Sequence, residues 1–306
     1  MQNSPHIPVL LDEVLRAFEG VEKGFIVDAT LGFGGHSQAL LKAHKDIKII
    51  ACEQDEQALE FSKNKLAEFA SRVQFHHLNF AELFDKIDIK GVKGVLADIG
   101  VSSFQLDSDE RGFSIYSNSL DMRMDKRQSL TAFEIVNFYP QDEIERIFKD
   151  FGELKDAHFL AQKLCQIRTQ KLISSAKELA QILGTQTMRG RSGVSRAILG
   201  FQALRIAVNK ELEALQKLLN ALQKLKPQGC IVAIISFHSL EDRLVKNAFK
   251  QWARTCICDE NAFQCTCQNN HNLGKILTKK ALTPKEQECR ANSRSKCAKM
   301  RVFRFD

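Results

Sequence analysis

Two segments of the chain combine acids and glycines in a way that could serve one chemical site. DATLGFGGHS, from Asp28 to Ser37, is an acid followed by a glycine turn, and DIGVSSFQL, from Asp98 to Leu106, has an acid and a glycine at the end of an apolar run. In an α/β chain, an acid at the end of a strand marks the crevice in which open parallel sheets bind ligands. The pattern therefore indicates an enzyme with a cofactor crevice.

The glycine turn is more typical of one cofactor than of another. Gly32 and Gly34 allow positive φ angles and close approach of a ligand to the backbone. A dinucleotide fingerprint would need a glycine where Ser37 stands. The spacing suits S-adenosylmethionine instead, with Asp28 near its methionine end. Glu53 follows about 25 residues later, where an acid can accept hydrogen bonds from ribose hydroxyls; the alternative is a solvent-facing loop acid.

The composition is that of a globular enzyme. The chain has 306 residues, 44% hydrophobic and 26% charged, and no apolar run approaches the ~20 residues that span a bilayer. The N-terminal segment lacks the basic start, apolar core and cleavage site of an export signal. Nine cysteines in such a chain favour reduced thiols over a disulfide framework. We expect a cytoplasmic protein with no membrane partner.

Positive charge is concentrated near the C-terminus. The formal net charge is +7, and the stretch from Lys275 to Arg304 holds ten basic residues against two acids. This asymmetry favours a polyanionic partner, most simply nucleic acid. A solvated basic tail explains the charge equally well.

Strand and helix patterns alternate in the first hundred residues. Apolar spacing predicts helices at 36–44, 55–70 and 80–87. Strands that alternate with helices form a parallel, doubly wound sheet. The expected strands are Gly24–Asp28, Lys48–Cys52, Val73–His77 and Val95–Asp98.

The strand pattern stops between Ser129 and Leu199, where three- and four-residue apolar spacing predicts an all-helical insertion. We therefore expect an α/β catalytic domain of residues 1–108 and 207–306, interrupted by a helical domain of residues 109–206. The later expected elements are a helix at Asn209–Leu225, a strand at Cys230–Ser236, and basic strands at Lys275–Lys280 and Ala298–Phe305. We expect the two basic strands to form an antiparallel pair at the sheet edge.

Long, distinctive motifs run through the whole chain. They are HIPVLLDEVL, DATLGFGGHS, CEQDEQAL, DIGVSSFQLDSDERGFS, LDMRMD, FQALRIAVNKEL, ISFHSLEDRLVK and NSRSKCAKMRVFR. Together they resemble the RsmH (MraW) family of bacterial methyltransferases. The resemblance implies a class I S-adenosylmethionine-dependent methyltransferase fold. It also implies methylation of the N4 amine of a cytidine in the decoding centre of 16S ribosomal RNA.

The departures from the family pattern are few. Glu53 stands where the family usually has Asp, Phe104 and Ser119 where it usually has Pro, and Ser293 where Asn-Pro-Arg is usual. None removes a group that the chemistry needs. Glu53 adds one methylene at the ribose contact.

The resemblance implies a set of cofactor contacts in these motifs. S-adenosylmethionine would be held by the first turn, by an acid at the ribose, by an aromatic side chain at the adenine and by the loop after the fourth strand. For Phe80 the alternative is ordinary core packing. The implied residues are Gly34, Gly35, His36, Glu53, Phe80, Asp98 and Gln105.

The implied reaction needs positioning and a proton acceptor. The N4 amine of cytosine is a poor nucleophile because its lone pair is delocalised into the ring. Positioning lowers the barrier, and an acceptor contributes ~10²–10⁴-fold. Asp98 is the candidate acceptor; the alternative is that it only binds the cofactor. The methyl group would pass directly, without a metal or a covalent intermediate.

ISFHSLEDRLVK ends the expected fifth strand and opens a helix. We expect His238 to contact substrate and Arg243 to bind a phosphate or an internal acid. Ser239 and Asp242 resemble a capping box, so part of the motif would only start the helix. We also expect Arg196 and Arg294 to contact RNA, together with the other arginines of the insertion, Arg189, Arg191 and Arg205, and the basic C-terminal hairpin.

A third pattern is a cysteine cluster. Cys256-x-Cys258 and Cys265-x-Cys267, with His271 nearby, could bind zinc. The pattern favours reduced thiols without a metal, because zinc ligands are usually separated by two or more residues.

Other functions remain open at this level. One is methylation of a protein or small molecule, which the basic hairpin and helical insertion disfavour. Another is a non-catalytic RNA-binding assembly factor, which the intact glycine turn, Glu53 and the DIGVSS loop disfavour. The expected partner is 16S rRNA in the small ribosomal subunit or a late assembly intermediate. The residues leave open whether the substrate is naked or assembled RNA, and whether the chain forms a homodimer.

Overall fold

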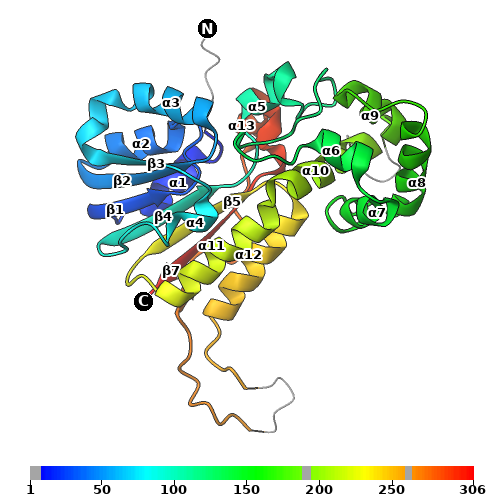
Figure 1. The fold of residues 1–306 in the computed structure, drawn as a ribbon. Coiled ribbons are helices and arrows are strands. Elements are labelled where there is room, and N and C mark those ends of the chain that lie inside the picture. The colour runs from blue at the N-terminus through cyan, green and yellow to red at the C-terminus, as the bar shows by residue number, and fades with distance from the viewer. Residues whose placement is uncertain (1–7, 188–193, 259–263) are drawn as a thin grey trace. The chain divides into compact units, whose positions relative to one another are not determined.

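The computed structural model describes residues 8–187, 194–258 and 264–306 (Figure 1). The chain divides into two compact units. Residues 1–100 and 213–306 form the sheet unit, and residues 101–212 form the helical unit. The helical unit begins eight residues before the expected boundary, because the chain leaves the sheet unit directly after Gly100, and it ends six residues after the expected one.

The sheet unit is built on one seven-stranded sheet, counted over the described residues, in the order β3-β2-β1-β4-β5-β7-β6. The first five strands are parallel, whereas β7 is antiparallel to both β5 and β6. The predicted doubly wound sheet with an antiparallel edge is therefore confirmed. The strands are β1 (Lys23–Asp28), β2 (Asp46–Glu53), β3 (Val73–His77), β4 (Val92–Asp98), β5 (Ile231–Ser236), β6 (Gly274–Ile276) and β7 (Lys299–Phe305).

Alternating strand residues fill two cores, one on each face of the sheet. Ile26 and Leu96 belong to the cluster that includes α1, α2 and α3, and Val27 and Val95 belong to the cluster that includes α4, α11 and α12. Apolar residues at consecutive positions fit strands that are covered on both faces. The helices are α1 (Leu11–Phe18), α2 (Gly35–Ala43), α3 (Glu56–Lys65), α4 (Phe80–Leu83), α11 (Glu211–Leu225), α12 (Ser239–Trp252) and α13 (Glu286–Ala291).

Three expected elements are clearly shorter than predicted. The helix expected at 80–87 is only α4, Phe80–Leu83. The helix expected at 55–70 ends at Lys65, and a separate 3₁₀ segment, Ala67–Arg72, follows it. β6 ends at Ile276. The Leu277 N–H still donates to the Val302 carbonyl (2.9 Å), but the Val302 N–H donates to the Thr278 hydroxyl (2.9 Å) instead of a backbone carbonyl. Thr278, Lys279 and Lys280 therefore follow the strand and are not part of it.

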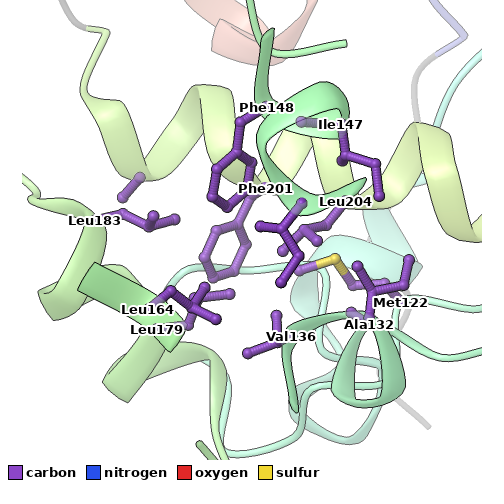
Figure 2. Packing of buried hydrophobic residues seen from close by; sticks show 14 of the residues in the cluster. Met122, Ala132, Val136, Ile147, Phe148, Leu164, Leu179, Leu183, Phe201 and Leu204 are labelled. Atoms are coloured by element: carbon purple, nitrogen blue, oxygen red, sulfur yellow. The ribbon is translucent and has the colours of Figure 1, made fainter. Parts of the chain in front are cut away.

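The helical unit is a set of short helices around one core. Figure 2 shows Phe148, Leu164, Leu179, Phe201 and Leu204 packed together. Capping side chains define where helices begin; for example, Thr131 and Glu134 form a capping box on α6. Its helices are α5 (Ser103–Asp107), α6 (Ala132–Phe138), α7 (Gln141–Asp150), α8 (Ala157–Arg168), α9 (Ala176–Leu183) and α10 (Arg196–Asn209).

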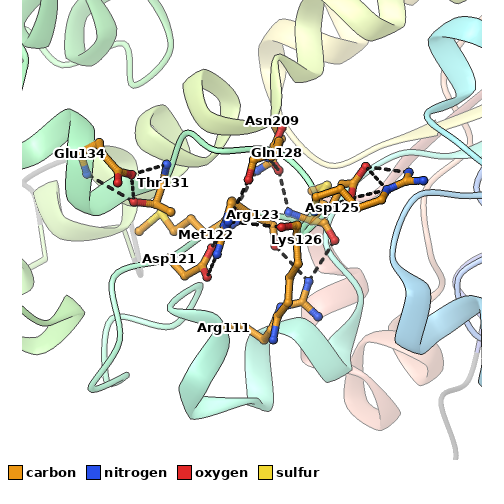
Figure 3. Close-up of polar contacts among 12 residues, drawn as sticks. Arg111, Asp121, Met122, Arg123, Asp125, Lys126, Gln128, Thr131, Glu134 and Asn209 are labelled. Atoms are coloured by element: carbon orange, nitrogen blue, oxygen red, sulfur yellow. Dashed lines mark hydrogen bonds and ion pairs between the residues drawn. The ribbon is translucent and has the colours of Figure 1, made fainter.

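The motif LDMRMD has a structural role within the helical unit (Figure 3). The Asn209 side chain donates to Met122 O (2.8 Å) and accepts from the Met124 N–H (2.7 Å). Buried Arg111 donates to the carbonyls of Arg123 and Met124. The polar groups of this irregular segment are thus paired away from water, as buried backbone requires.

No helix in the described part of the chain is long and apolar enough to cross a membrane.

Replacing the central amide of this network should destabilise the fold. Asn209→Ala leaves the Met124 N–H and the Met122 carbonyl without their partner, so we expect the free energy of unfolding to fall by about 2–4 kcal/mol. Urea unfolding followed by circular dichroism measures this change. Exposed Asn220, the matched control, should tolerate Asn220→Ala within about 0.5 kcal/mol. Equal stability of the two variants would contradict a structural role for Asn209.

Candidate cofactor edge of the sheet

The carboxyl ends of β1 and β4 meet where the strand order reverses. From β1 the chain continues to β2 on one side, whereas β4 lies on the other side and continues to β5. Open α/β sheets bind ligands outside the carboxyl ends of their strands at this point. Asp28 ends β1, Glu53 ends β2 and Asp98 ends β4. The fold therefore brings the predicted acids to one edge.

Asp28 anchors the glycine turn. Its carboxylate accepts hydrogen bonds from the Ser37 hydroxyl (2.6 Å) and the Thr30 N–H (3.3 Å). Burial raises the pKa of Asp28, and the Ser37 hydrogen bond opposes that shift. Ser37 is the residue that departs from the dinucleotide fingerprint, and its hydroxyl attaches the first turn of α2 to β1. The oxygens of Asp28 are thus used in positioning the turn.

The glycines of the turn have distinct roles. Gly32 and Gly34 have φ angles of 52° and 69°, so the expectation of left-handed backbone is confirmed. Gly35 is needed for packing, because a Cβ there would lie 2.5 Å from Pro8 Cγ. Helix α2 begins directly after this turn, and its first N–H groups have no partners within the helix.

Glu53 closes the turn from the neighbouring strand. Its two carboxylate oxygens accept from the Gly32 N–H (2.7 Å) and the Asp55 N–H (2.8 Å). Burial raises the pKa of Glu53 to about 7, although both hydrogen bonds lower it. Glu53 is therefore fixed at the edge and is not a mobile loop acid. Its ionisation falls in the physiological range.

His36 and Asp98 form a largely buried pair at this edge whose polar atoms are not all hydrogen-bonded. His36 Nε2 lies 3.4 Å from Asp98 Oδ2, and the His36 residue is only 7% exposed. Both ring nitrogens of His36 and Asp98 Oδ1 are buried without a hydrogen-bond partner. Buried polar atoms are normally hydrogen-bonded, so these atoms indicate a polar ligand at the edge. An amino acid moiety with its own donors and acceptors fits this need.

Thr30 was not singled out from the sequence, yet it joins the two acid-bearing strands. Its hydroxyl accepts a hydrogen bond from the Asp98 N–H at 2.6 Å. Ser62 was missed too: its hydroxyl donates to the Gly32 carbonyl (2.7 Å). A hydroxyl residue two positions after Asp28 was the available signal for Thr30. No local pattern indicates Ser62, which lies on α3.

Phe80 begins α4 and is 8% exposed. It belongs to the core cluster that contains Val27 and Cys52. Asn79 caps the helix by accepting from the Ala81 N–H (2.9 Å). The structure therefore places Phe80 next to the carboxyl ends of β1 and β2, with most of its surface in the core.

The end of β5 is organised differently from the expectation. The residue that caps α12 is His238, paired with Glu241, so the expected Ser239–Asp242 capping box is wrong by one position. His238 Nε2 also lies 3.1 Å from Glu241 Oε1. Asp242 binds Arg301 (2.6 Å); burial raises its pKa, but the Arg301 hydrogen bond and charge outweigh this and lower it. The acids of this motif are thus used in structural contacts.

The remaining predicted residues lie in both units. Gln105, in the helical unit, forms a capping box with Ser102 on α5, and Arg196 pairs with Asp156. Arg243 and Arg294 are exposed residues of the sheet unit. Arg205 pairs with Glu211 at 2.8 Å within the helical unit. Arg189 and Arg191 lie outside the described residues.

Known proteins resemble this chain in sequence over nearly its whole length. The MraW methylase family matches residues 3–306. Proteins named Ribosomal RNA small subunit methyltransferase H are 56% identical in Campylobacter jejuni serotype O:6 (99% of this chain, 97% of the relative) and 54% identical in Campylobacter lari (99% of both chains). The relative of that name in Campylobacter fetus is 52% identical and covers 98% of both chains. Because the family match and these relatives cover nearly the whole chain, the chain belongs to the MraW methylase family, as a class I methyltransferase that uses S-adenosylmethionine.

Proposed function

We propose that this chain methylates the N4 amine of a cytidine in the decoding centre of 16S rRNA. The names of relatives at 52–56% identity support ribosomal RNA of the small subunit as the substrate. The observation that carries the reaction is the His36–Asp98 pair, whose buried atoms lack partners at the carboxyl edge of β1 and β4. The small ribosomal subunit or a late assembly intermediate would present the base.

The cofactor would be held by the residues of this edge. Gly34, Gly35 and His36 would bind it at the start of α2, and Glu53 would accept from the ribose. Phe80 would contact the adenine, and Gln105, on α5, is a further candidate. When bound, S-adenosylmethionine supplies an electrophilic methyl group on a sulfonium.

Asp98 would act on the attacking amine. Its Oδ1 lacks a partner, while Thr30 holds its backbone N–H and His36 lies beside Oδ2. A carboxylate in this position can accept a hydrogen bond from the amine. This contact favours localisation of the lone pair on the nitrogen and so makes the amine a better nucleophile. Such an acceptor contributes ~10²–10⁴-fold to rate.

Covalent catalysis by a cysteine is not supported at this edge. Burial raises the pKa of Cys52, near the carboxyl end of β2, far above its usual range. Cys230, whose pKa burial raises to about 12, precedes β5 and lies at the opposite end of the strands. The thiolate, not the thiol, is the nucleophile in such mechanisms. Direct transfer to nitrogen is therefore the reaction that these residues favour.

The basic residues near the C-terminus are divided between two uses. Arg301 points to Asp242, and Arg290 pairs with Glu286. Lys275, Lys296 and Arg304 are exposed and suited to phosphate contacts. RNA affinity should therefore fall with rising salt, as phosphate contacts release counterions.

The direct test uses methyl-labelled S-adenosylmethionine with unmodified 30S subunits and, separately, naked 16S rRNA. Nucleoside mass spectrometry then identifies the product. N4-methylcytidine is the expected product. Label on another nucleoside or on protein would overturn the proposed target, as would no label from a chain that binds the cofactor.

Replacing the proposed acceptor should slow turnover without unfolding the chain. Asp98→Asn removes the charge but keeps the shape, so we expect kcat to fall by about 10²-fold or more. The dissociation constant for S-adenosylhomocysteine should change only a few-fold.

Exposed Asp85 provides the matched control, and Asp85→Asn should keep full turnover. Wild-type turnover in Asp98→Asn would remove Asp98 from the mechanism. Loss of binding with normal turnover at saturation would restrict it to cofactor contact.

Cofactor affinity should rise with pH near neutrality. The carboxylate of Glu53 is the form that accepts from ribose hydroxyls, and its pKa is about 7 in the free chain. If only this form binds well, affinity should be about tenfold weaker at pH 6 than at pH 8. Isothermal titration with 5′-methylthioadenosine measures this, because this ligand lacks the titrating amino group.

Folding cannot produce the same trend. A raised carboxyl pKa stabilises the folded chain below about pH 4.5, and this contribution is lost as the pH rises through about 7. Stability and affinity thus change in opposite directions. Glu53→Gln should bind weakly at every pH, with no step near 7. A step that persists in Glu53→Gln would assign the titration to another group.

A further inference from the structure

Four cysteines converge on the segment that joins α12 to β6. The sulfur atoms of Cys256, Cys258, Cys265 and Cys267 all lie within 4.8 Å of one another. The Cys256–Cys265 and Cys265–Cys267 pairs are 3.6 Å apart, and the Cys267–Cys256 pair is 3.7 Å apart. These separations are far too long for disulfide bonds, which are about 2.05 Å.

The separations fit a metal tetrahedron. Four sulfurs at the ~2.3 Å distance typical of zinc would be ~3.8 Å apart along each edge. The 3.6–3.7 Å separations among Cys256, Cys265 and Cys267 are close to this value, and Cys258 Sγ lies within 4.8 Å of these three sulfurs. Tetrahedral sets of four thiolates select zinc or iron–sulfur centres. A sulfide-bridged cluster needs room for several irons between its thiolates, so a single ion fits better.

Backbone contacts bring the two arms of the segment together. The Leu273 N–H donates to Trp252 O (2.7 Å), and the His271 N–H donates to Thr255 O (2.9 Å). Closer to the cysteines, the Thr255 hydroxyl donates to Asn269 Oδ1 (2.8 Å). Each arm therefore presents one Cys-x-Cys pair to the other arm. This pairing across arms explains why the single-residue spacing, which disfavours zinc in the sequence, does not prevent a four-sulfur site.

Local hydrogen bonds also suit thiolates. The Thr266 N–H donates to Cys258 Sγ at 3.4 Å. Backbone donors of this kind orient metal ligands and tune them. His271 is not a fifth ligand, because its Nε2 interacts with Cys267 O at 2.8 Å.

The segment has no apolar core to hold it. Figure 1 shows it extending away from the end of α12. No described residue between 254 and 272 belongs to the buried hydrophobic clusters, and Ile257 is 61% exposed. Segments that cannot bury apolar surface are commonly stabilised by a metal or disulfides.

We propose that Cys256, Cys258, Cys265 and Cys267 bind one structural Zn²⁺ ion. Binding replaces four S–H bonds with four Zn–S bonds and releases the thiol protons to solvent. Four protein ligands leave no open position for a reacting water, as in other structural zinc sites. The site lies at the amino end of β5, since α12 runs back from the carboxyl end. It is thus remote from His36 and Asp98 in the sheet unit.

Zinc content of the full-length chain tests the proposal. Reduced chain is equilibrated with one equivalent of Zn²⁺ and passed through a desalting column, and the metal is measured by mass spectrometry. We expect about one zinc per chain, and less than about a tenth of that for Cys256→Ser combined with Cys267→Ser. Cys297→Ser, an exposed cysteine outside the cluster, is the control and should retain zinc.

Two further measurements make the result independent of whether the variant folds. Wild-type chain loaded with Co²⁺ should show the intense spectrum of tetrahedral cobalt thiolates. Zinc should also protect these four cysteines, and no others, from alkylation. S-adenosylhomocysteine binding should survive zinc loss. A metal-free wild type, iron with sulfide, or zinc loss in Cys297→Ser equal to that in the double variant would overturn the proposal.

Discussion

The meeting of β1 and β4 at their carboxyl ends is the constraint on which the site depends. The Asp98 N–H binds the Thr30 hydroxyl, so the acid of one strand is fixed to the turn that follows the other. Ser37 attaches the helix to Asp28, and Glu53 holds the Gly32 N–H. With these groups occupied, His36 and Asp98 keep the buried atoms that still need a partner. We propose that the cofactor and the substrate amine supply the missing partners at this edge.

Much of the fold could be predicted because its signals are local. Apolar residues at consecutive positions, as at Ile26 and Val27, indicate strands covered on both faces, and they place the acids at strand ends. The contacts of Thr30 and Ser62 could not be predicted, since each depends on the register between segments that are far apart in sequence. The capping residue of α12 could not be predicted correctly from the sequence either. His238 takes the capping position because Glu241 can reach back to it, whereas the hydroxyl of Ser239 suggested the next residue.

Two sequence motifs, LDMRMD and the paired cysteines, have roles that their sequence patterns alone did not predict. LDMRMD is among the most distinctive stretches, yet Asn209 and Arg111 bind its backbone and give it a structural role in the helical unit. The cysteine pairs show the reverse case. Their spacing argued against a metal, but two arms tied at Trp252 and Leu273 place the sulfurs of Cys256, Cys265 and Cys267 at the separations of a zinc tetrahedron, with Cys258 Sγ within 4.8 Å of them. In both cases the tertiary contacts decide what the residues do.

The central claim is that the unpartnered ring nitrogens of His36 serve the cofactor, whereas Asp98 Oδ1 is left for the attacking amine. A crystal structure of the chain with S-adenosylhomocysteine tests it most directly. The account predicts that the ligand lies at the carboxyl edge of β1 and β4, hydrogen-bonds a His36 ring nitrogen and leaves Asp98 Oδ1 available to the amine. A ligand bound elsewhere, with the His36 ring still unpartnered, would contradict it.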